Sequence, residues 1–286
     1  MWNSKVMWSC LLLAALTIEL TAAAAGPSFL LYTRRNWDEA QRVEPEVEYL
    51  MRSSFYAAEP IVLLLPQWQG NATAERELAL IETLLQREAC NVFAVQLEAA
   101  TSEVQIVAAV RDLLLLLRQQ FEVPLQRQQL IGYAEGAHLA AAAAAQVQQA
   151  LHEQVARITA LDPSQENVEL QHKLSSQDAQ FVEVIHTSNS SEQLGDADFY
   201  PNGGELQPGC TTAVCAQQRA LELAIEMWSP GNEFIIANCG ALQSMSASNC
   251  RWSTQRMGVT AKQGIYFLET HSSAPFGRGA YHIAFL

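Results

Sequence analysis

Two glycines frame a segment that could present a catalytic residue. Gly132 and Gly136 enclose Tyr133, Ala134 and Glu135, and the segment follows the apolar pair Leu130-Ile131. In hydrolases with a nucleophilic serine, Gly-x-Ser-x-Gly forms a sharp strand-to-helix turn, and glycines flank the serine because larger side chains do not fit there. The central residue here is Ala134, which has no nucleophilic atom. The spacing therefore predicts the turn without its nucleophile.

Short apolar runs alternate with helical patterns around this turn. Ser102 and Gln105 form a capping box that predicts the start of one helix. The alternation of strands and helices predicts an α/β fold, a mostly parallel sheet with helices on both faces. The predicted strands cover residues 61–65, 92–95, 129–132, 155–161, 181–185, 234–237 and 264–269. The predicted helices cover 75–87, 104–117, the Ala-rich segment to about 154, and 213–228.

The composition is that of an ordinary globular chain. Its 286 residues are 49% hydrophobic and 16% charged, which excludes collagen-like and mostly disordered proteins because enough apolar surface can be buried. The formal net charge is −13. A chain this acidic lacks the basic face that a phosphate backbone requires, so we expect no nucleic-acid partner.

The N-terminus has the layout of a secretory signal peptide. Lys5 precedes an apolar run from Val6 to Ile18, and Ala22 to Ala25 supply small residues for cleavage. The alternative is an uncleaved membrane anchor, but the run is shorter than the roughly 20 residues that a spanning helix needs. We therefore expect a signal peptide over residues 1–25, a single domain over 26–286, no transmembrane segment, and a secreted, extracellular protein.

Secretion would place the remaining five cysteines in an oxidising compartment, where disulfides form. Short separations favour the pairs Cys210–Cys215 and Cys239–Cys250 and leave Cys90 as either a buried thiol or an intermolecular bridge. The sequons at Asn71 and Asn189 are candidate glycosylation sites in that pathway.

Several segments resemble the secreted pancreatic-type lipase family, which includes insect phospholipases A1 and fly yolk proteins. The matching residues keep the family's order from about residue 29 to residue 279. They include Leu31-Tyr32-Thr33-Arg34 with Asn36, Gly136-Ala137-His138, 157–163 (Arg-Ile-Thr-Ala-Leu-Asp-Pro), 198–204 (Asp-Phe-Tyr-Pro-Asn-Gly-Gly) and 264–270 (Gly-Ile-Tyr-Phe-Leu-Glu-Thr). The resemblance implies the α/β-hydrolase fold and carboxylic ester hydrolysis, without the family's C-terminal β-sandwich.

The resemblance also implies where a catalytic triad would lie. The serine position is Ala134, the aspartate position is Asp162, and the histidine position is Gln217, which cannot act as a general base. The oxyanion loop, His-Gly-Trp in the family, is Pro66-Gln67-Trp68, so the backbone amides of Trp68 and Glu135 would be the donors. We expect Asp162 to be a structural carboxylate at the end of its strand.

The missing groups decide which function we expect. Losing the serine or the histidine of such a triad lowers the rate by about 10⁶-fold. His138 and His186 match family positions without an identifiable nucleophile beside them. We expect a catalytically inactive pseudo-lipase that binds a lipid, another hydrophobic ligand or an extracellular protein partner, with no cofactor and no metal. The alternatives are a weakly active lipase or phospholipase A1 with an unrecognised nucleophile, and a ligand-free storage or structural protein.

The family's lid is a disulfide-bounded loop over the active-site cleft. Here it would be the loop between Cys210 and Cys215, which holds four residues and is similar to the short lids of the phospholipases A1. A short lid would leave apolar surface open to a ligand.

Overall fold

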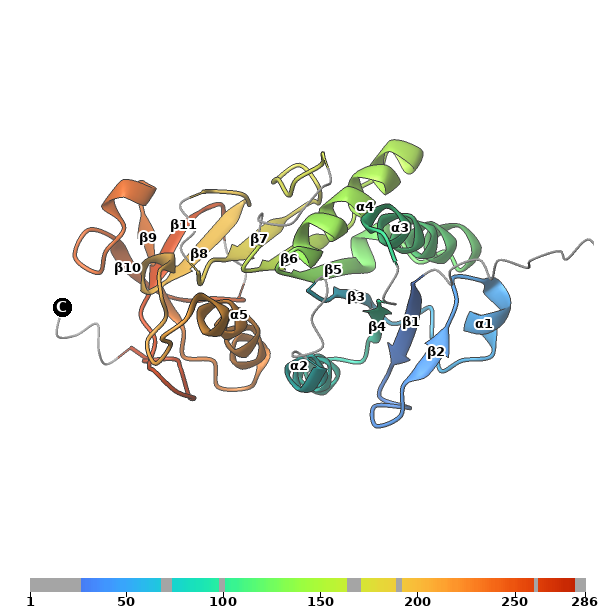
Figure 1. Cartoon of the computed structure of the whole chain (residues 1–286), viewed down its shortest axis with the longest axis horizontal. Coiled ribbons are helices and arrows are strands. Elements are labelled where there is room, and N and C mark those ends of the chain that lie inside the picture. Colours follow the sequence, from blue (N-terminus) through green and yellow to red (C-terminus); the bar gives the residue numbers. More distant parts are fainter. Residues whose placement is uncertain are drawn as a thin grey trace, which may run out of the picture.

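The computed structural model describes residues 27–67, 74–97, 101–163, 171–188, 192–259 and 262–280. Its core is one large sheet with the strand order β10-β9-β11-β8-β7-β6-β5-β3-β4-β1-β2 (Figure 1). Neighbouring strands are parallel from β4 through β3, β5, β6, β7 and β8 to β11, and antiparallel at both ends. The strands are β1 (Ser28–Tyr32), β2 (Gln41–Val43), β3 (Ile61–Leu65), β4 (Asn91–Gln96), β5 (Gln128–Tyr133), β6 (Arg157–Leu161), β7 (Val182–Ile185), β8 (Ala197–Pro201), β9 (Ile235–Cys239), β10 (Arg251–Arg256) and β11 (Gly264–Leu268).

Helices cover both faces of the sheet, as predicted. Figure 1 shows α3 (Glu103–Gln120) and α4 (Gly136–Leu151) on one face, and α2 (Ala74–Arg87) and α5 (Ala213–Trp228) on the other. Two separate hydrophobic clusters fill the layers on the two faces. The short helix α1 (Val47–Met51) lies beside β2, and the 3-10 turns are η1 (Leu125–Arg127), η2 (Asn202–Gly204) and η3 (Leu242–Ser244).

Local sequence signals explain where the helices begin and end. Helix α3 begins with the predicted capping box, in which the Ser102 hydroxyl accepts from the Gln105 amide and the Gln105 side chain accepts from the Ser102 amide. Helix α4 stops at Leu151, a few residues before the predicted end, because His152 takes a left-handed conformation (φ 55°). The strand predicted from Val155 begins at Arg157, since the Ala156 amide donates instead to the carbonyls of Leu125 and Gln128.

Both predicted disulfides are present. Cys210, which precedes α5, pairs with Cys215 in the first turn of that helix. Cys239 at the end of β9 pairs with Cys250 just before β10. Each bridge closes a short loop, and each stabilises the fold by about 2–4 kcal/mol through the loss of unfolded-state entropy.

Cys90 is a buried thiol, with 1% of its surface exposed. Burial, followed by the negative charges of Glu88 and Glu59, raises the pKa of this thiol to about 12. At pH 8 about one molecule in 10,000 therefore carries the reactive thiolate. We expect Ellman's reagent to leave the native protein unmodified for hours and to titrate one thiol after denaturation without reductant; rapid reaction of the native protein would show that this site opens.

Candidate functional site

The predicted turn joins β5 to α4 with the geometry of a nucleophile elbow. Ala134 has a left-handed backbone (φ 51°), and its amide donates to the Leu161 carbonyl at 3.0 Å. A Cβ on Gly132 would lie 2.3 Å from the Cα of Ala137, and a Cβ on Gly136 would lie 2.5 Å from the carbonyl oxygens of Leu65 and Pro66. Both glycines are therefore required by close backbone packing, while the residue that the elbow presents is an alanine.

Asp162 follows the neighbouring strand β6 and is buried, with 4% of its surface exposed. Its Oδ1 accepts from the backbone amides of Thr187 (2.7 Å) and Ser188 (2.9 Å), and its Oδ2 accepts from the Ser188 hydroxyl. This carboxylate therefore ties the end of β6 to the chain that leaves β7. Nothing in the sequence pointed to Ser188 as a partner of this carboxylate.

Gln217 lies in the second turn of α5 and has a polar partner in the oxyanion-loop segment. The Gln67 side chain donates from Nε2 to the Gln217 Oε1 at 3.4 Å. Because Pro66 contacts Gly136, this contact brings Gln217 to the same edge of the sheet as the elbow. Two glutamine amides thus meet where the family resemblance places a general base and a glycine.

Two ionisable side chains, Tyr133 and Glu135, flank Ala134 in the elbow. Glu135 follows Ala134 and is a buried residue at the N-cap of α4. Burial, and then the nearby Asp162 carboxylate, raises the pKa of the Tyr133 hydroxyl above its usual range. That hydroxyl is fully buried and makes no hydrogen bond to any described residue. Burial therefore keeps the Tyr133 hydroxyl protonated beside Ala134, so it offers no nucleophile in place of the missing serine.

The two buried histidines belong to other networks. The His138 Nδ1 accepts from the Leu174 amide at 3.1 Å. The His186 Nε2 lies 2.8 Å from Asp198 Oδ1, and its ring stacks on Tyr200 at 4.4 Å between centroids. Neither geometry pairs an imidazole with Asp162.

The short lid is part of a helix terminus. Thr212 is the N-cap of α5, and its hydroxyl accepts from the Cys215 amide at 3.2 Å, so the loop enclosed by the disulfide already includes the first turn of the helix. Leu206 ahead of this loop and Val214 within it are 52% and 64% exposed. The loop is therefore anchored, and apolar side chains remain at the surface around it.

Several predicted sites lie outside the described residues, namely the signal peptide at 1–25, Trp68, and the sequons at Asn71 and Asn189. Within the described ranges, no cluster of three His, Cys, Asp or Glu side chains is placed to hold a metal ion. No helix among those residues has both the length and the apolar character to cross a membrane.

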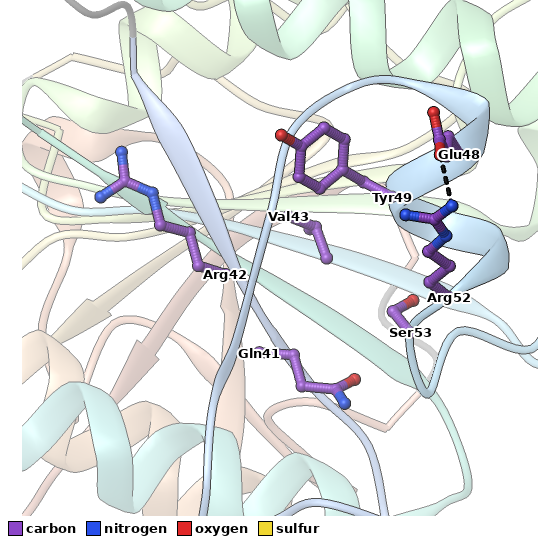
Figure 2. Close-up of a pocket in the computed structure, with 7 residues that line it drawn as sticks. All are labelled: Gln41, Arg42, Val43, Glu48, Tyr49, Arg52 and Ser53. Atoms are coloured by element: carbon purple, nitrogen blue, oxygen red, sulfur yellow. Dashed lines mark ion pairs between the residues drawn. The ribbon is translucent and has the colours of Figure 1, made fainter.

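A surface depression of about 500 Å³ lies between β2 and α1, far from the elbow. Figure 2 shows Gln41 and Val43 on the side of β2 that faces α1, with Arg42 on the other side. The Glu48–Arg52 ion pair (2.6 Å) runs along the helix. This lining contains no nucleophile with a neighbouring base.

The family's sequence pattern covers nearly the whole chain. A model of the family described as Lipase matches residues 13–276. The chain belongs to the lipase family. Membership of this family, with the mostly parallel sheet and its helix layers, confirms the predicted α/β-hydrolase fold.

Proteins similar to this chain include a vitellogenin and two pancreatic lipase-related proteins. Vitellogenin-2 of Ceratitis capitata is 32% identical over an alignment of 189 positions that covers 62% of this chain and 45% of that protein. Pancreatic lipase-related protein 3 of Homo sapiens is 26% identical over 87% of this chain and 64% of its own length. Inactive pancreatic lipase-related protein 1 of Canis lupus familiaris is 28% identical over 74% of this chain and 49% of its own length. The chain spans less than two thirds of each of these relatives.

Proposed function

We propose that this member of the lipase family is a secreted pseudo-lipase, which binds a lipid or another hydrophobic ligand without hydrolysing it. The observation that carries the proposal is the elbow itself, which keeps both glycines and its left-handed turn but presents Ala134. Retention of the scaffold without its nucleophile supports a role in binding.

Apolar exposure around the short disulfide loop supports a hydrophobic ligand. Leu206 and Val214 stand at the surface beside Cys210 and Cys215. The two disulfides are compatible with an extracellular location. The names of two relatives, a vitellogenin and an inactive lipase-related protein, give examples of lipase-family chains that are not named as enzymes.

The test of ligand binding is extraction of the purified, secreted protein with organic solvent, followed by mass spectrometry. We expect a recurring lipid species in an amount comparable to that of the protein. A protein that yields no lipid and takes up none from a hydrophobic probe solution would contradict binding and favour the storage or structural role.

A weakly active esterase is the second candidate, and the contact between Ser188 and Asp162 is the observation that favours it. A carboxylate is a poor base for a serine hydroxyl, and no described histidine bridges the two groups. If Ser188 were a nucleophile, Ser188→Ala would abolish turnover while Ser53→Ala, beside the edge strand β2, would not.

Restoring two triad residues should return little activity. In the variant Ala134→Ser with Gln217→His, Gln67 and the buried Glu135 remain beside the reacting position. Loss of one oxyanion donor alone lowers kcat by about 10²–10³-fold. We expect hydrolysis of a short-chain p-nitrophenyl ester to stay at least that far below the rate of an intact lipase; a rate close to an intact lipase would show a functional oxyanion loop.

A further inference from the structure

A depression of about 590 Å³ lies on the side of the molecule opposite to the elbow. Its lining consists of Arg34 and Trp37, which follow β1, and Glu82, Leu85 and Gln86 in the last turns of α2. Tyr32 at the end of β1 pairs with Val92 near the start of β4, whereas Ala134 follows the carboxyl end of β5. The depression is therefore at the other edge of the sheet from the proposed lipid site.

Trp37 is presented by a rigid turn. The Asn36 side chain accepts from the Thr33 amide (3.0 Å) and hydroxyl (2.6 Å), and it donates to the carbonyls of Leu31 (2.8 Å) and Glu39 (3.1 Å). The indole on this turn is 58% exposed. The fixed, exposed indole offers its aromatic face to a ligand that enters the depression.

Arg34 is fixed in place by the end of α2. Its Nε donates to the Leu85 carbonyl at 2.6 Å and its Nη2 donates to the Gln86 carbonyl at 3.0 Å. These bonds use two of the helix-terminal carbonyls and leave Nη1 without a described acceptor. The guanidinium is thus pre-oriented and can donate to an anionic oxygen at the rim of the depression.

Glu82 supplies the opposite charge on the same lining. Its Oε1 accepts from the Gln86 side chain at 3.2 Å, which leaves Oε2 available to a ligand. The carboxylate lies in the C-terminal part of α2, where the helix dipole also favours a cation. An ammonium group next to this carboxylate and against the Trp37 ring would gain both ion-pair and cation–π energy.

We propose that this depression binds a small zwitterion, a molecule that joins an ammonium group to an anionic oxygen group by a short linker. Trp37 and Glu82 hold the ammonium group, Arg34 holds the anion, and the buried Leu85 forms an apolar floor beneath the linker. Either a soluble compound or a zwitterionic lipid headgroup carries this chemistry.

Phosphocholine is the probe, and isothermal titration calorimetry at low salt is the measurement. We expect saturable binding in the millimolar range, since the depression is open and makes few contacts. Trp37→Ala should weaken binding about tenfold, as expected from loss of a cation–π contact of about 1.4 kcal/mol. Glu82→Gln should weaken it about threefold. Choline alone should bind more weakly than phosphocholine because it lacks the group that Arg34 recognises.

Tyr49→Ala is the matched control, because Tyr49 is a half-exposed aromatic residue of the unrelated depression beside α1. It should bind phosphocholine like the unmodified protein, and all variants should unfold at the same temperature. Co-sedimentation with phosphatidylcholine vesicles that soluble phosphocholine reverses would identify a lipid headgroup as the source. Binding of phosphocholine without co-sedimentation would identify a soluble compound. Absence of saturable binding, or equal affinity in Trp37→Ala, would overturn the proposal and leave the pseudo-lipase assignment untouched.

Discussion

Gly132→Ala will lower the free energy of unfolding by at least about 3 kcal/mol, because the new methyl group overlaps the backbone of α4. Its Cβ would lie 2.3 Å from the Cα and 2.5 Å from the amide nitrogen of Ala137, and 2.6 Å from the Gly136 carbonyl oxygen. These are backbone atoms of a helix packed on the sheet, so they cannot rotate away as a flexible side chain would. Urea unfolding followed by circular dichroism measures the change as a lower midpoint at unchanged slope.

Gly240→Ala is the control for the Gly132 experiment. A Cβ at Gly240 meets nothing within 4 Å, so this variant should stay within about 1 kcal/mol of the unmodified protein. Equal stability of Gly132→Ala and Gly240→Ala would show that the elbow is looser than its geometry indicates. The retention of the elbow would then carry no weight for the pseudo-lipase proposal.

Asp162→Ala will destabilise the fold by about 3–4 kcal/mol, although we propose no catalysis for this residue. The substitution leaves the amides of Thr187 and Ser188 without their acceptor, and each such loss costs about 1–3 kcal/mol. Alanine also tolerates the left-handed backbone at this position (φ 47°) less well than aspartate does. Thermal and urea unfolding measure the loss.

Asp162→Asn separates charge from hydrogen bonding, since the amide oxygen still accepts and asparagine tolerates the same backbone. We expect this variant to lose about 1 kcal/mol, and the exposed Asp38→Ala to lose less than about 0.5 kcal/mol. If Asp162→Ala were as stable as Asp38→Ala, the carboxylate would not be structural, and its burial would need a functional reason.

The strands that could be predicted are those whose apolar residues form a clear pattern along the chain. Ile61–Leu65 is a continuous apolar run because β3 is buried between two helix layers. Strand β8 was missed because Asp198 interrupts its apolar pattern and Pro201 ends it. Asp198 is tolerated in the core since it accepts from His186 (2.8 Å) and from the amides of Leu194 (2.9 Å) and Gly195 (3.0 Å). Gly195 and Leu194 lie three and four positions before Asp198 in an irregular segment, and His186 lies twelve positions before it, so the apolar alternation of a strand could not reveal these partners.

One part of the candidate site could also be predicted from the sequence, and another part could not. The elbow could be predicted because Gly132, Ala134 and Gly136 are close in sequence and the steric demand of the turn is local. The contact between Gln67 and Gln217 could not, because it joins residues 150 positions apart. Ser188 carries no signal of its own, since a serine after a strand is ordinary loop chemistry until the fold brings it to Asp162.

Ester hydrolysis by the purified, unmodified protein tests the central claim most directly. Release of p-nitrophenol from a short-chain ester, and of fatty acid from phosphatidylcholine, would be followed before and after treatment with covalent serine and cysteine reagents. The absence of a nucleophile at Ala134 and of a base at Gln217 predicts no release above the rate in buffer, with or without the reagents. Turnover that follows the protein through successive purification steps and disappears with either reagent would contradict the assignment as a pseudo-lipase.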